Sequence, residues 1–276
     1  MTDRYAVVGN PVAHSLSPQI HAAFARQTGA DVEYTRLLAP LDGFAASVSA
    51  FRAGGGRGVN VTLPFKLEAW RLATRRSERA EQAAAANTLK FDGDEIFGDN
   101  TDGAGLTRDI EINLGGALAG KRILLLGAGG AARGVLLPLI ERKPVALVIA
   151  NRTDDKARDL AAHFSRWGRC VARRFDELGG TAGDAGFDVV INATSASVAG
   201  ALPPLGAGVF APGALAYDMM YGEKAALFLD FSRTQGAAMV ADGLGMLVEQ
   251  AAESFFVWRG VRPQTAPVIA QLREKR

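Results

Sequence analysis

Short runs of hydrophobic residues alternate along the chain with longer, mixed segments that suit helices. Tyr5 to Val8 and Arg122 to Leu126 have the length of strands, and Leu244 to Arg259 has the length of a helix. Alternation of strands and helices is typical of helix layers packed on a largely parallel sheet. The pattern therefore predicts an α/β fold.

The N-terminal part of the chain contains predicted strands that end in polar segments. We predict strands at 5–8, 32–38 and 57–61, helices at 18–28, 65–76 and 77–85, and a hairpin of 87–91 with 95–97. Ser17 is the expected N-cap of the first helix, with Pro18 at its first position. The turn of the hairpin is Asp92-Gly93-Asp94.

The remainder of the chain repeats a rhythm of strand, loop and helix. We predict strands near 122–126, 145–150, 169–174, 187–192, 214–217 and 237–240, and a long helix at 244–259. Six strands in this rhythm match a doubly wound dinucleotide-binding domain. We place a first domain at 1–104 and a second at 105–244, and we expect the helices at about 245–276 to pack back onto the first domain.

A glycine-rich turn follows the strand at 122–126 and opens a helix. The segment from Gly127 to Ala132 fits G-x-G-x-x-G/A, with Ala132 in the third place. The first glycine allows a tight turn, the second lets the backbone approach a pyrophosphate, and the small third residue lets helix and strand pack closely. Free N–H groups at the helix N-terminus favour the anion. The predicted cofactor-binding residues here are Gly127, Ala128, Gly129, Gly130 and Ala131.

The tip of the next strand carries Asn151-Arg152-Thr153, where an NAD site commonly has an acidic residue. Arg152 and Thr153 offer a cation and a hydroxyl group, which suit the 2′-phosphate of NADP, and Lys156 adds a second cation. The alternative is a solvated surface arginine. A later strand closes with Asn192-Ala193-Thr194-Ser195, and strand ends of this kind face the cofactor crevice unless they merely cap a loop. The sequence predicts NADP as the cofactor, with Thr194 beside it.

Composition argues against several other classes of protein. The net charge of +2, with basic residues scattered among acids, argues against nucleic acid or an anionic membrane surface as a partner. Cys170 is the single cysteine, so the chain has no internal disulfide or Cys-rich metal site, and we predict no bound metal. No run reaches the ~18 apolar residues of a membrane span. Because the N-terminus lacks the apolar run of a signal peptide, we expect a cytoplasmic protein. The sequence leaves open whether it is a monomer or a homodimer.

Three polar clusters at predicted strand ends suit the binding of a small polar substrate. The clusters are Gly9 to Pro18, Gly58 to Lys66, and Ala86 to Leu89 with Gly98 to Gly103. Together with the glycine turn, Asn151-Arg152-Thr153 and Asp242 to Gln250, and in this order over nearly the whole chain, they resemble the shikimate dehydrogenase family. The resemblance implies an α/β substrate domain, a doubly wound Rossmann domain that binds NADP, and a cleft between the two.

By motif match, the resemblance implies that Lys66 and Asp102 are a catalytic pair beside the reacting hydroxyl group. A lysine and an aspartate in hydrogen-bonding reach order a substrate and pass its proton, and the sequence leaves open which of them is the base. Taken alone, Lys66 suits a surface charge and Asp102 a helix cap. The implied substrate-binding residues are Ser15, Ser17, Asn60, Thr62, Asn87, Tyr221 and Gln250, and Met219 and Gly243 are implied cofactor contacts.

The implied reaction is reversible hydride transfer between NADPH and a ring carbonyl, which converts 3-dehydroshikimate to shikimate. Two alternatives stay open: a relative that acts on quinate or on both acids, and a regulator that binds NADP(H) without turnover. Quinate has an extra ring hydroxyl, so a few contacts decide between the two acids. A regulator would have no need for both Lys66 and Asp102. The three histidines, His14, His21 and His163, are expected to have packing or surface roles.

Overall fold

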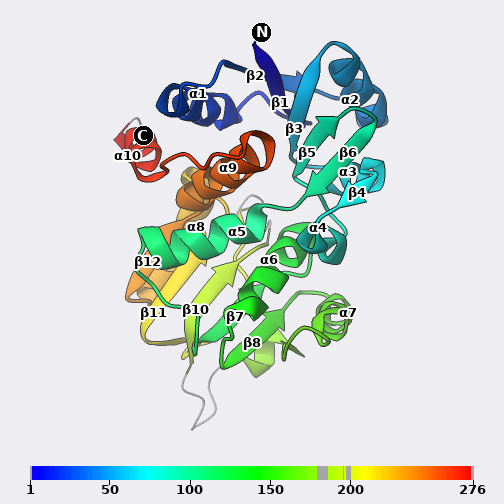
Figure 1. The fold of residues 1–276 in the computed structure, drawn as a ribbon. Coiled ribbons are helices and arrows are strands. Elements are labelled where there is room, and N and C mark those ends of the chain that lie inside the picture. The colour runs from blue at the N-terminus through cyan, green and yellow to red at the C-terminus, as the bar shows by residue number, and fades with distance from the viewer. Residues whose placement is uncertain (1, 179–185, 195, 197–199, 275–276) are drawn as a thin grey trace. The chain divides into compact units, whose positions relative to one another are not determined.

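The computed structural model of the chain describes residues 2–178, 186–194, 196 and 200–274. The chain forms two compact units, one made of Met1–Gly105 with Leu247–Arg276 and the other of Leu106–Met246 (Figure 1). We call them the first and the second unit. Helices α5 (Asp102–Arg108) and α9 (Leu244–Arg259) carry the chain from one unit into the other.

The first unit is built on a mixed sheet with the strand order β2-β1-β3-β5-β6-β4. Its strands are β1 (Asp3–Gly9), β2 (Val32–Leu38), β3 (Gly56–Val61), β4 (Arg75–Arg76), β5 (Thr88–Asp92) and β6 (Glu95–Asp99). β1 pairs parallel with β2 and β3, whereas β5 pairs antiparallel with β3 and β6. Its other helices are α1 (Ser17–Thr28), α2 (Phe44–Ala53), α3 (Lys66–Leu72), α4 (Glu78–Ala83) and α10 (Ala266–Glu274).

Helices cover both faces of this sheet. On one face, Val8 of β1 packs in a hydrophobic core with Phe44 of α2. On the other face, Tyr5 of β1 stacks on Trp258 of α9, with ring centroids 4.5 Å apart. The indole N–H of Trp258 donates to the backbone oxygen of Leu89 at 3.0 Å, which fixes α9 against the sheet. Alternate side chains of a strand point to opposite faces, so β1 is buried on both sides.

The second unit has an all-parallel sheet in the order β12-β11-β10-β7-β8-β9. The strands are β7 (Arg122–Leu126), β8 (Ala146–Ala150), β9 (Val171–Arg173), β10 (Phe187–Asn192), β11 (Phe210–Asp218) and β12 (Met239–Asp242). The helices are α6 (Gly130–Glu141), α7 (Asp154–Phe164) and α8 (Glu223–Thr234), with short helical turns η1 (Asp109–Asn113) and η2 (Phe175–Glu177). From one edge the strands run third, second, first, fourth, fifth and sixth, which is the doubly wound order of dinucleotide-binding domains.

Both faces of this parallel sheet are also covered. Leu125 and Ile149 belong to the core that contains side chains of α6 and α7. Leu124 and Val148 belong to a second core, which contains Phe228 of α8. Strands that are buried on both faces consist of continuous runs of apolar residues, and the sequences of β7 and β8 have this pattern. The structure confirms the predicted α/β fold and its doubly wound sheet.

One predicted helix is wrong at its end, and one helix was not predicted. The helix expected at 65–76 stops at Leu72, and Arg75–Arg76 forms the strand β4, parallel to β6. Pairing with β6 is reinforced by Arg75, whose guanidinium lies 4.3 Å from the ring centroid of Phe97. Tertiary pairing therefore overrides the helix propensity of an arginine-rich segment. α2 (Phe44–Ala53) was not predicted from the sequence.

The predicted N-cap role of Ser17 is also wrong. Ser17 is the first residue of α1, and Leu16 takes the N-cap position without a side-chain hydrogen bond. The hydroxyl of Ser15 accepts the backbone N–H of Ser17 at 3.2 Å, so the residue two positions earlier satisfies a free donor at this helix end. Pro18 is the second residue of α1, one position later than predicted, and lies in its first turn.

Candidate active site

Several strand ends meet at one edge of the first unit's sheet. Asn60 lies in β3 near its end, Thr88 begins β5 and Asp99 ends β6, and Thr88 is the ladder partner of both others. Because β5 is antiparallel to both neighbours, its beginning lies beside their ends. The backbone oxygen of Lys66, at the start of α3, accepts the N–H of Ala86 at 2.9 Å. The topology thus gathers polar side chains from distant segments at this edge.

Lys66 and Asp102 form a close ion pair at this edge. Lys66 begins α3 and Asp102 begins α5, and Nζ lies 2.5 Å from Oδ2. The Lys66 side chain is 23% exposed and that of Asp102 is 8% exposed, so the pair is partly shielded from water. Opposite charges in such an environment attract more strongly than they would in water. The structure brings together the two residues for which the sequence implies proton transfer.

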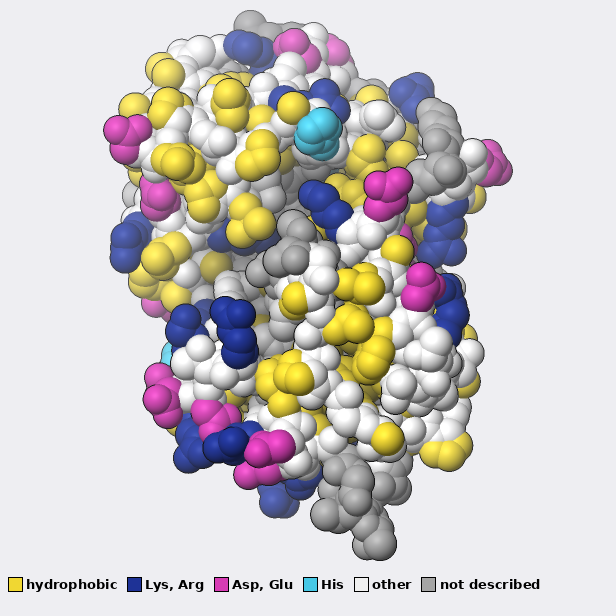
Figure 2. Space-filling view, turned by 180° about the vertical axis from the view of Figure 1, so that it is seen from behind, with side chains coloured by type: hydrophobic (Ala, Val, Ile, Leu, Met, Phe, Trp, Pro, Cys, Tyr) yellow, Lys and Arg dark blue, Asp and Glu magenta, His cyan; other side chains and the backbone are white. Residues whose placement is uncertain are grey.

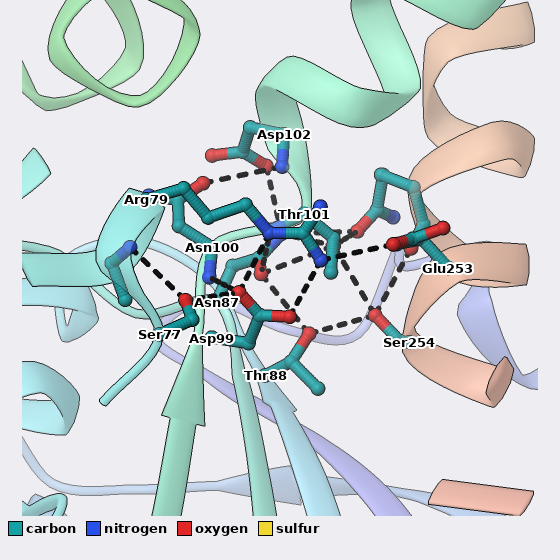
Figure 3. A network of polar contacts seen from close by, with 12 residues as sticks. Ser77, Arg79, Asn87, Thr88, Asp99, Asn100, Thr101, Asp102, Glu253 and Ser254 are labelled. Atoms are coloured by element: carbon teal, nitrogen blue, oxygen red, sulfur yellow. Dashed lines mark hydrogen bonds and ion pairs between the residues drawn. The ribbon is translucent and has the colours of Figure 1, made fainter. Parts of the chain in front are cut away.

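Asn87, directly before β5, orients the carboxylate of Asp102 (Figure 3). Its Nδ2 lies 2.9 Å from Asp102 Oδ1, 2.9 Å from Thr101 Oγ1 and 3.1 Å from Gln250 Oε1. Its Oδ1 accepts the backbone N–H of Thr101 at 2.9 Å, which fixes the orientation of the amide. An amide nitrogen has two hydrogens for these three acceptors, so it can bond to at most two of them at once.

The predicted residues Ser15 and Thr62 lie on loops at the same end of the sheet, and Ser17 begins α1 there. The hydroxyl of Ser15 donates to that of Ser17 at 3.1 Å, ahead of and within the first turn of α1. Thr62 follows β3, and a Cβ on Gly9 would lie 2.4 Å from its Cγ2. Glycine at the end of β1 therefore allows the loop after β1 to approach the loop after β3.

Asn60 is held by His21 and Tyr34, two residues that sequence reasoning did not place at the site. Asn60 Oδ1 accepts the Tyr34 hydroxyl at 2.8 Å and lies 3.1 Å from His21 Nε2. The His21 ring is fully buried and stacks on Tyr34, with centroids 4.2 Å apart. The only signal in the sequence is that His21 lies four residues after Ser17, on the same side of α1.

Thr101 and Ser254 were also missed. Ser254 Oγ lies 2.9 Å from Asn60 Nδ2 and 2.7 Å from Thr88 Oγ1, and it lies 3.3 Å from Thr101 Oγ1. Ser254 comes one helical turn after Gln250, so the spacing puts both on one face of α9 and could have indicated the serine.

His21 predicts an acid sensitivity of the fold. Burial lowers the pKa of His21 from 6.5 to about 3, although the hydrogen bond with Asn60 opposes the shift. Between these values the unfolded chain binds a proton that the folded chain does not, so stability is complete above pH 6.5 and is lost as the pH falls. We expect the free energy of unfolding to drop by about 2 kcal/mol between pH 7 and pH 5 from this residue.

Urea unfolding at a series of pH values checks this expectation. His21→Gln should flatten the dependence between pH 7 and pH 5, whatever its stability at pH 7. His14→Gln, which changes an exposed histidine, is the matched control and should keep the wild-type slope. Equal slopes for the wild type and His21→Gln would contradict the assignment.

In the second unit, the glycine turn leads from β7 into α6. Gly127 has φ +110°, in the region that favours glycine, and a Cβ there would lie 3.1 Å from the oxygen of Ala193 and 3.3 Å from Thr194 Cγ2. Around a Cβ on Gly129 or Gly130 there is open space to at least 4 Å. The start of α6 has no side-chain cap, so its N–H groups are available to an anion. These features fit a dinucleotide pyrophosphate.

The other predicted cofactor residues lie at strand ends of the same sheet. Arg152, Thr153 and Lys156 are exposed at the end of β8 and the start of α7, and Asn151 Nδ2 donates to the oxygen of Thr153 at 2.8 Å. A Cβ on Gly243, after β12, would lie 2.3 Å from the oxygen of Met219, so these two segments are in close contact.

Thr194 is held at the end of β10 by Asn192, whose Oδ1 accepts its hydroxyl at 2.7 Å. Asn192 Nδ2 in turn donates to Asp218 at 2.8 Å, which ties β10 to β11. Ser195 lies outside the described residues. Tyr221 is half-buried on the loop between β11 and α8, and thus belongs to the second unit, unlike the other predicted substrate residues.

Three further features bear on the kind of site. Among the described residues, no group of three or more His, Cys, Asp or Glu side chains could hold a metal ion. No helix in the same part of the chain is long and apolar enough to cross a membrane. Acidic and basic side chains are interspersed over the face that Figure 2 shows.

The doubly wound sheet with its glycine turn defines the chain as a dinucleotide-binding α/β protein, with a second α/β unit that gathers a polar site. Three family models match it: the shikimate dehydrogenase substrate binding domain at residues 7–89, shikimate / quinate 5-dehydrogenase at 110–199, and the shikimate 5'-dehydrogenase C-terminal domain at 243–273. The chain belongs to the shikimate dehydrogenase family.

Similar proteins cover the chain from end to end. The shikimate dehydrogenase (NADP(+)) of Dechloromonas aromatica is 62% identical over 275 residues, which are 100% of this chain and 99% of that protein. The crystal structure of an Ael1 enzyme from Pseudomonas putida is 52% identical, with a TM-score of 0.92 and 98% of each chain covered. Shikimate 5-dehydrogenase from Thermus thermophilus, in complex with NADP(H) and shikimate, is 31% identical, with a TM-score of 0.84 and 99% of each chain covered.

Proposed function

We propose that the protein is an NADP-dependent shikimate dehydrogenase, which catalyses the reversible reduction of 3-dehydroshikimate to shikimate. The observation that carries this proposal is the Lys66–Asp102 pair, held at 2.5 Å beside amide and hydroxyl groups that suit a polyhydroxylated ring. Relatives with this activity in their names match the whole chain, and one neighbouring structure holds both NADP(H) and shikimate.

Lys66 and Asp102 are the groups that we assign to proton transfer. In the oxidative direction, the substrate hydroxyl loses its proton to this pair, and in the reductive direction the pair returns it to the carbonyl oxygen. Asn87 holds the Asp102 carboxylate in place through its bond to Oδ1 at 2.9 Å. Oδ2 is bonded to Lys66, so the two charges act as one unit that exchanges a proton with the substrate.

The other polar groups of the first unit would orient the ring. We assign the hydroxyl groups of Ser15 and Ser17 to the substrate carboxylate, because they lie at the start of α1, where a helix dipole favours an anion. Both carboxamides, Asn60 and Asn87, supply donors and acceptors for ring hydroxyls. The remaining proposed substrate contacts are Thr62, Gln250 and, from the second unit, Tyr221.

The second unit would hold NADP along its glycine turn. NADP(H), when bound, accepts or supplies the hydride of the reaction. The turn from Gly127 to Ala131 and the start of α6 offer N–H groups to the pyrophosphate. Arg152, Thr153 and Lys156 would bind the 2′-phosphate, with Asn151 holding the loop. Thr194, Met219 and Gly243 are the remaining proposed contacts.

Two other functions are alternatives to this one. A quinate dehydrogenase fits the same arrangement, and the name of the family model for 110–199 includes quinate. A regulator that binds NADP(H) without turnover would need neither the close approach of Lys66 to Asp102 nor their shielding. The pair therefore favours an enzyme. The cytoplasmic location and the choice between monomer and homodimer stay predictions from the sequence.

Absorbance of the reduced nicotinamide, with shikimate or quinate crossed against NADP or NAD, tests the proposal. We expect strong turnover with shikimate and NADP only. Turnover with quinate would indicate the broader relative, and turnover with NAD would contradict the role of Arg152. Binding of NADP without turnover in any combination would favour the regulator.

A further inference from the structure

A chain of charged side chains links the first unit's sheet to helix α9, and the proposed reaction makes no use of it. Arg79 on α4 forms a bidentate ion pair with Asp99 at the end of β6, with Nε–Oδ1 at 2.7 Å and Nη2–Oδ2 at 2.6 Å. Nη2 of the same guanidinium lies 3.0 Å from Oε1 of Glu253 on α9 (Figure 3). One arginine therefore connects the end of β6 with α9. Arg79 and Glu253 are 174 residues apart in the sequence.

The charges continue beyond Glu253. Arg262 bonds to Glu253 and, through Nη2, to Glu249 Oε2 at 2.8 Å. Glu249 is fully buried and accepts the hydroxyl of Thr265 at 2.5 Å. Five side chains of alternating sign thus run from the sheet along α9, and each buried carboxylate has a cationic partner. Such networks hold their elements in one geometry more rigidly than an isolated surface pair does.

Asp99 sets the path of the segment that leads to Asp102. It is 2% exposed, and it also accepts the Ser77 hydroxyl at 2.5 Å and the backbone N–H of Asn100 at 2.7 Å. Burial raises the pKa of Asp99, but the bonds from Arg79, Ser77 and Asn100 outweigh burial and lower it, so the carboxylate stays charged. Asn100 Oδ1 then accepts the backbone N–H of Asp102 at 3.2 Å.

On the other side, Glu253 lies three residues after Gln250 on α9, so the two are neighbours on that helix, and Ser254 lies four residues after Gln250. Gln250 Oε1 accepts from Asn87 at 3.1 Å, and Ser254 bonds with Asn60 at 2.9 Å. A shift of α9 would move both contacts together. Arg79 is therefore bonded both to the strand end that leads to Asp102 and to the helix that carries Gln250.

We propose that Arg79, acting through Asp99 and Glu253, is a positioning residue of the substrate site. Its guanidinium holds the segment before Asp102 and the face of α9 with Gln250 at a fixed spacing. The inference rests on the proposed function, since it assigns Arg79 a part in binding and turnover of the same ring substrate. Arg79 itself bonds to Asp99 and Glu253, so its effect passes through them.

Variants of Arg79 with matched variants of Arg75 test the proposal. Arg75 forms the same bidentate pair with Glu95, at 2.9 Å for both bonds, but these side chains are 59% and 41% exposed. We expect R79M to raise the KM for shikimate and lower kcat, with kcat/KM falling about 10-fold to 100-fold, because a small misplacement of reacting groups has effects of this size. R79K, with one point charge for two carboxylates, should show a smaller loss, and R75K and R75M should match the wild type.

Measurements of NADP affinity, and a variant of Glu253, distinguish a positioning role from a general loss of structure. The Kd for NADP, which binds the other unit, should stay within about twofold in every variant, because a folded second unit keeps its own sheet and turn. E253Q keeps the shape of Glu253 but removes its charge. It should raise the KM for shikimate while the bonds of Arg79 to Asp99 remain. Hydrogen exchange of the α9 amides at 249–254 should be faster in R79M and E253Q.

Unchanged KM and kcat in R79M, R79K and E253Q, even with a lowered Tm, would overturn the proposal and leave Arg79 a purely structural residue. If R79M does not fold, R79K and E253Q give the same decision. Failure of the proposed function looks different, because the wild type and the Arg75 variants would then also fail to turn over shikimate.

Discussion

Replacing Lys66 with Met should lower kcat by about 10²-fold to 10⁴-fold, the range that a positioned proton-transfer group contributes. Methionine keeps much of the length and volume of lysine but has neither charge nor donor, so the Asp102 carboxylate loses its partner at 2.5 Å. Asp102→Asn removes the other charge and should cause a loss of similar size. Because the two groups act as a pair, the double variant should be little worse than either single variant.

The NADP affinity of these variants distinguishes chemistry from folding. The Kd for NADP should be unchanged in Lys66→Met, since its proposed binding residues lie in the second unit. Arg71→Met is the matched control, because Arg71 is an exposed cation on the same helix, α3. Full turnover in Lys66→Met, or an equal loss in Arg71→Met, would refute the role of Lys66.

Replacing Arg152 with Ala should weaken NADP about 10-fold to 100-fold, the loss expected for charge-assisted hydrogen bonds to a phosphate. NAD lacks the 2′-phosphate, so its affinity should change by less than about twofold. The preference for NADP over NAD should therefore shrink by nearly the whole factor. Titration of both cofactors by protein fluorescence or calorimetry measures this ratio without requiring turnover.

Arg158→Ala is the control for the charge of this region. Arg158 lies further along α7, is 68% exposed and pairs with Asp154 at 3.2 Å. Its removal changes the net charge equally but should leave the ratio of the two affinities near that of the wild type. Equal weakening of NADP and NAD by Arg152→Ala would contradict the assignment to the 2′-phosphate.

Much of the second unit follows from the sequence, because its signals are local. The central strands β7 and β8 appear as short apolar runs, since helices cover both faces of the sheet. The turn at Gly127 is visible because a tight turn with a positive φ requires glycine there. A helix at Leu244–Arg259 was predicted with these bounds. None of these features depends on a residue far away in the sequence.

The first unit was harder to predict, because distant segments determine its details. Arg75–Arg76 forms a strand only because β6, 22 residues further on, pairs with it. His21 is buried because α1 packs it between Tyr34, Phe255 and Trp258, and its bond to Asn60 spans 39 residues. No local pattern separates such a histidine from one on the surface.

The sequence by itself determined the class of fold, the cofactor turn and the residue types available for chemistry, since these depend on periodicity and on backbone conformations that few residues adopt. Only the tertiary structure decided how those residues meet. Lys66 lies 2.5 Å from Asp102 across 36 residues, and Gln250 bonds to Asn87 across 163. Strand order and the buried charges that hold α9 on the sheet set these distances. The energy of each contact depends on how deeply its groups are buried, which a short segment of the sequence does not determine.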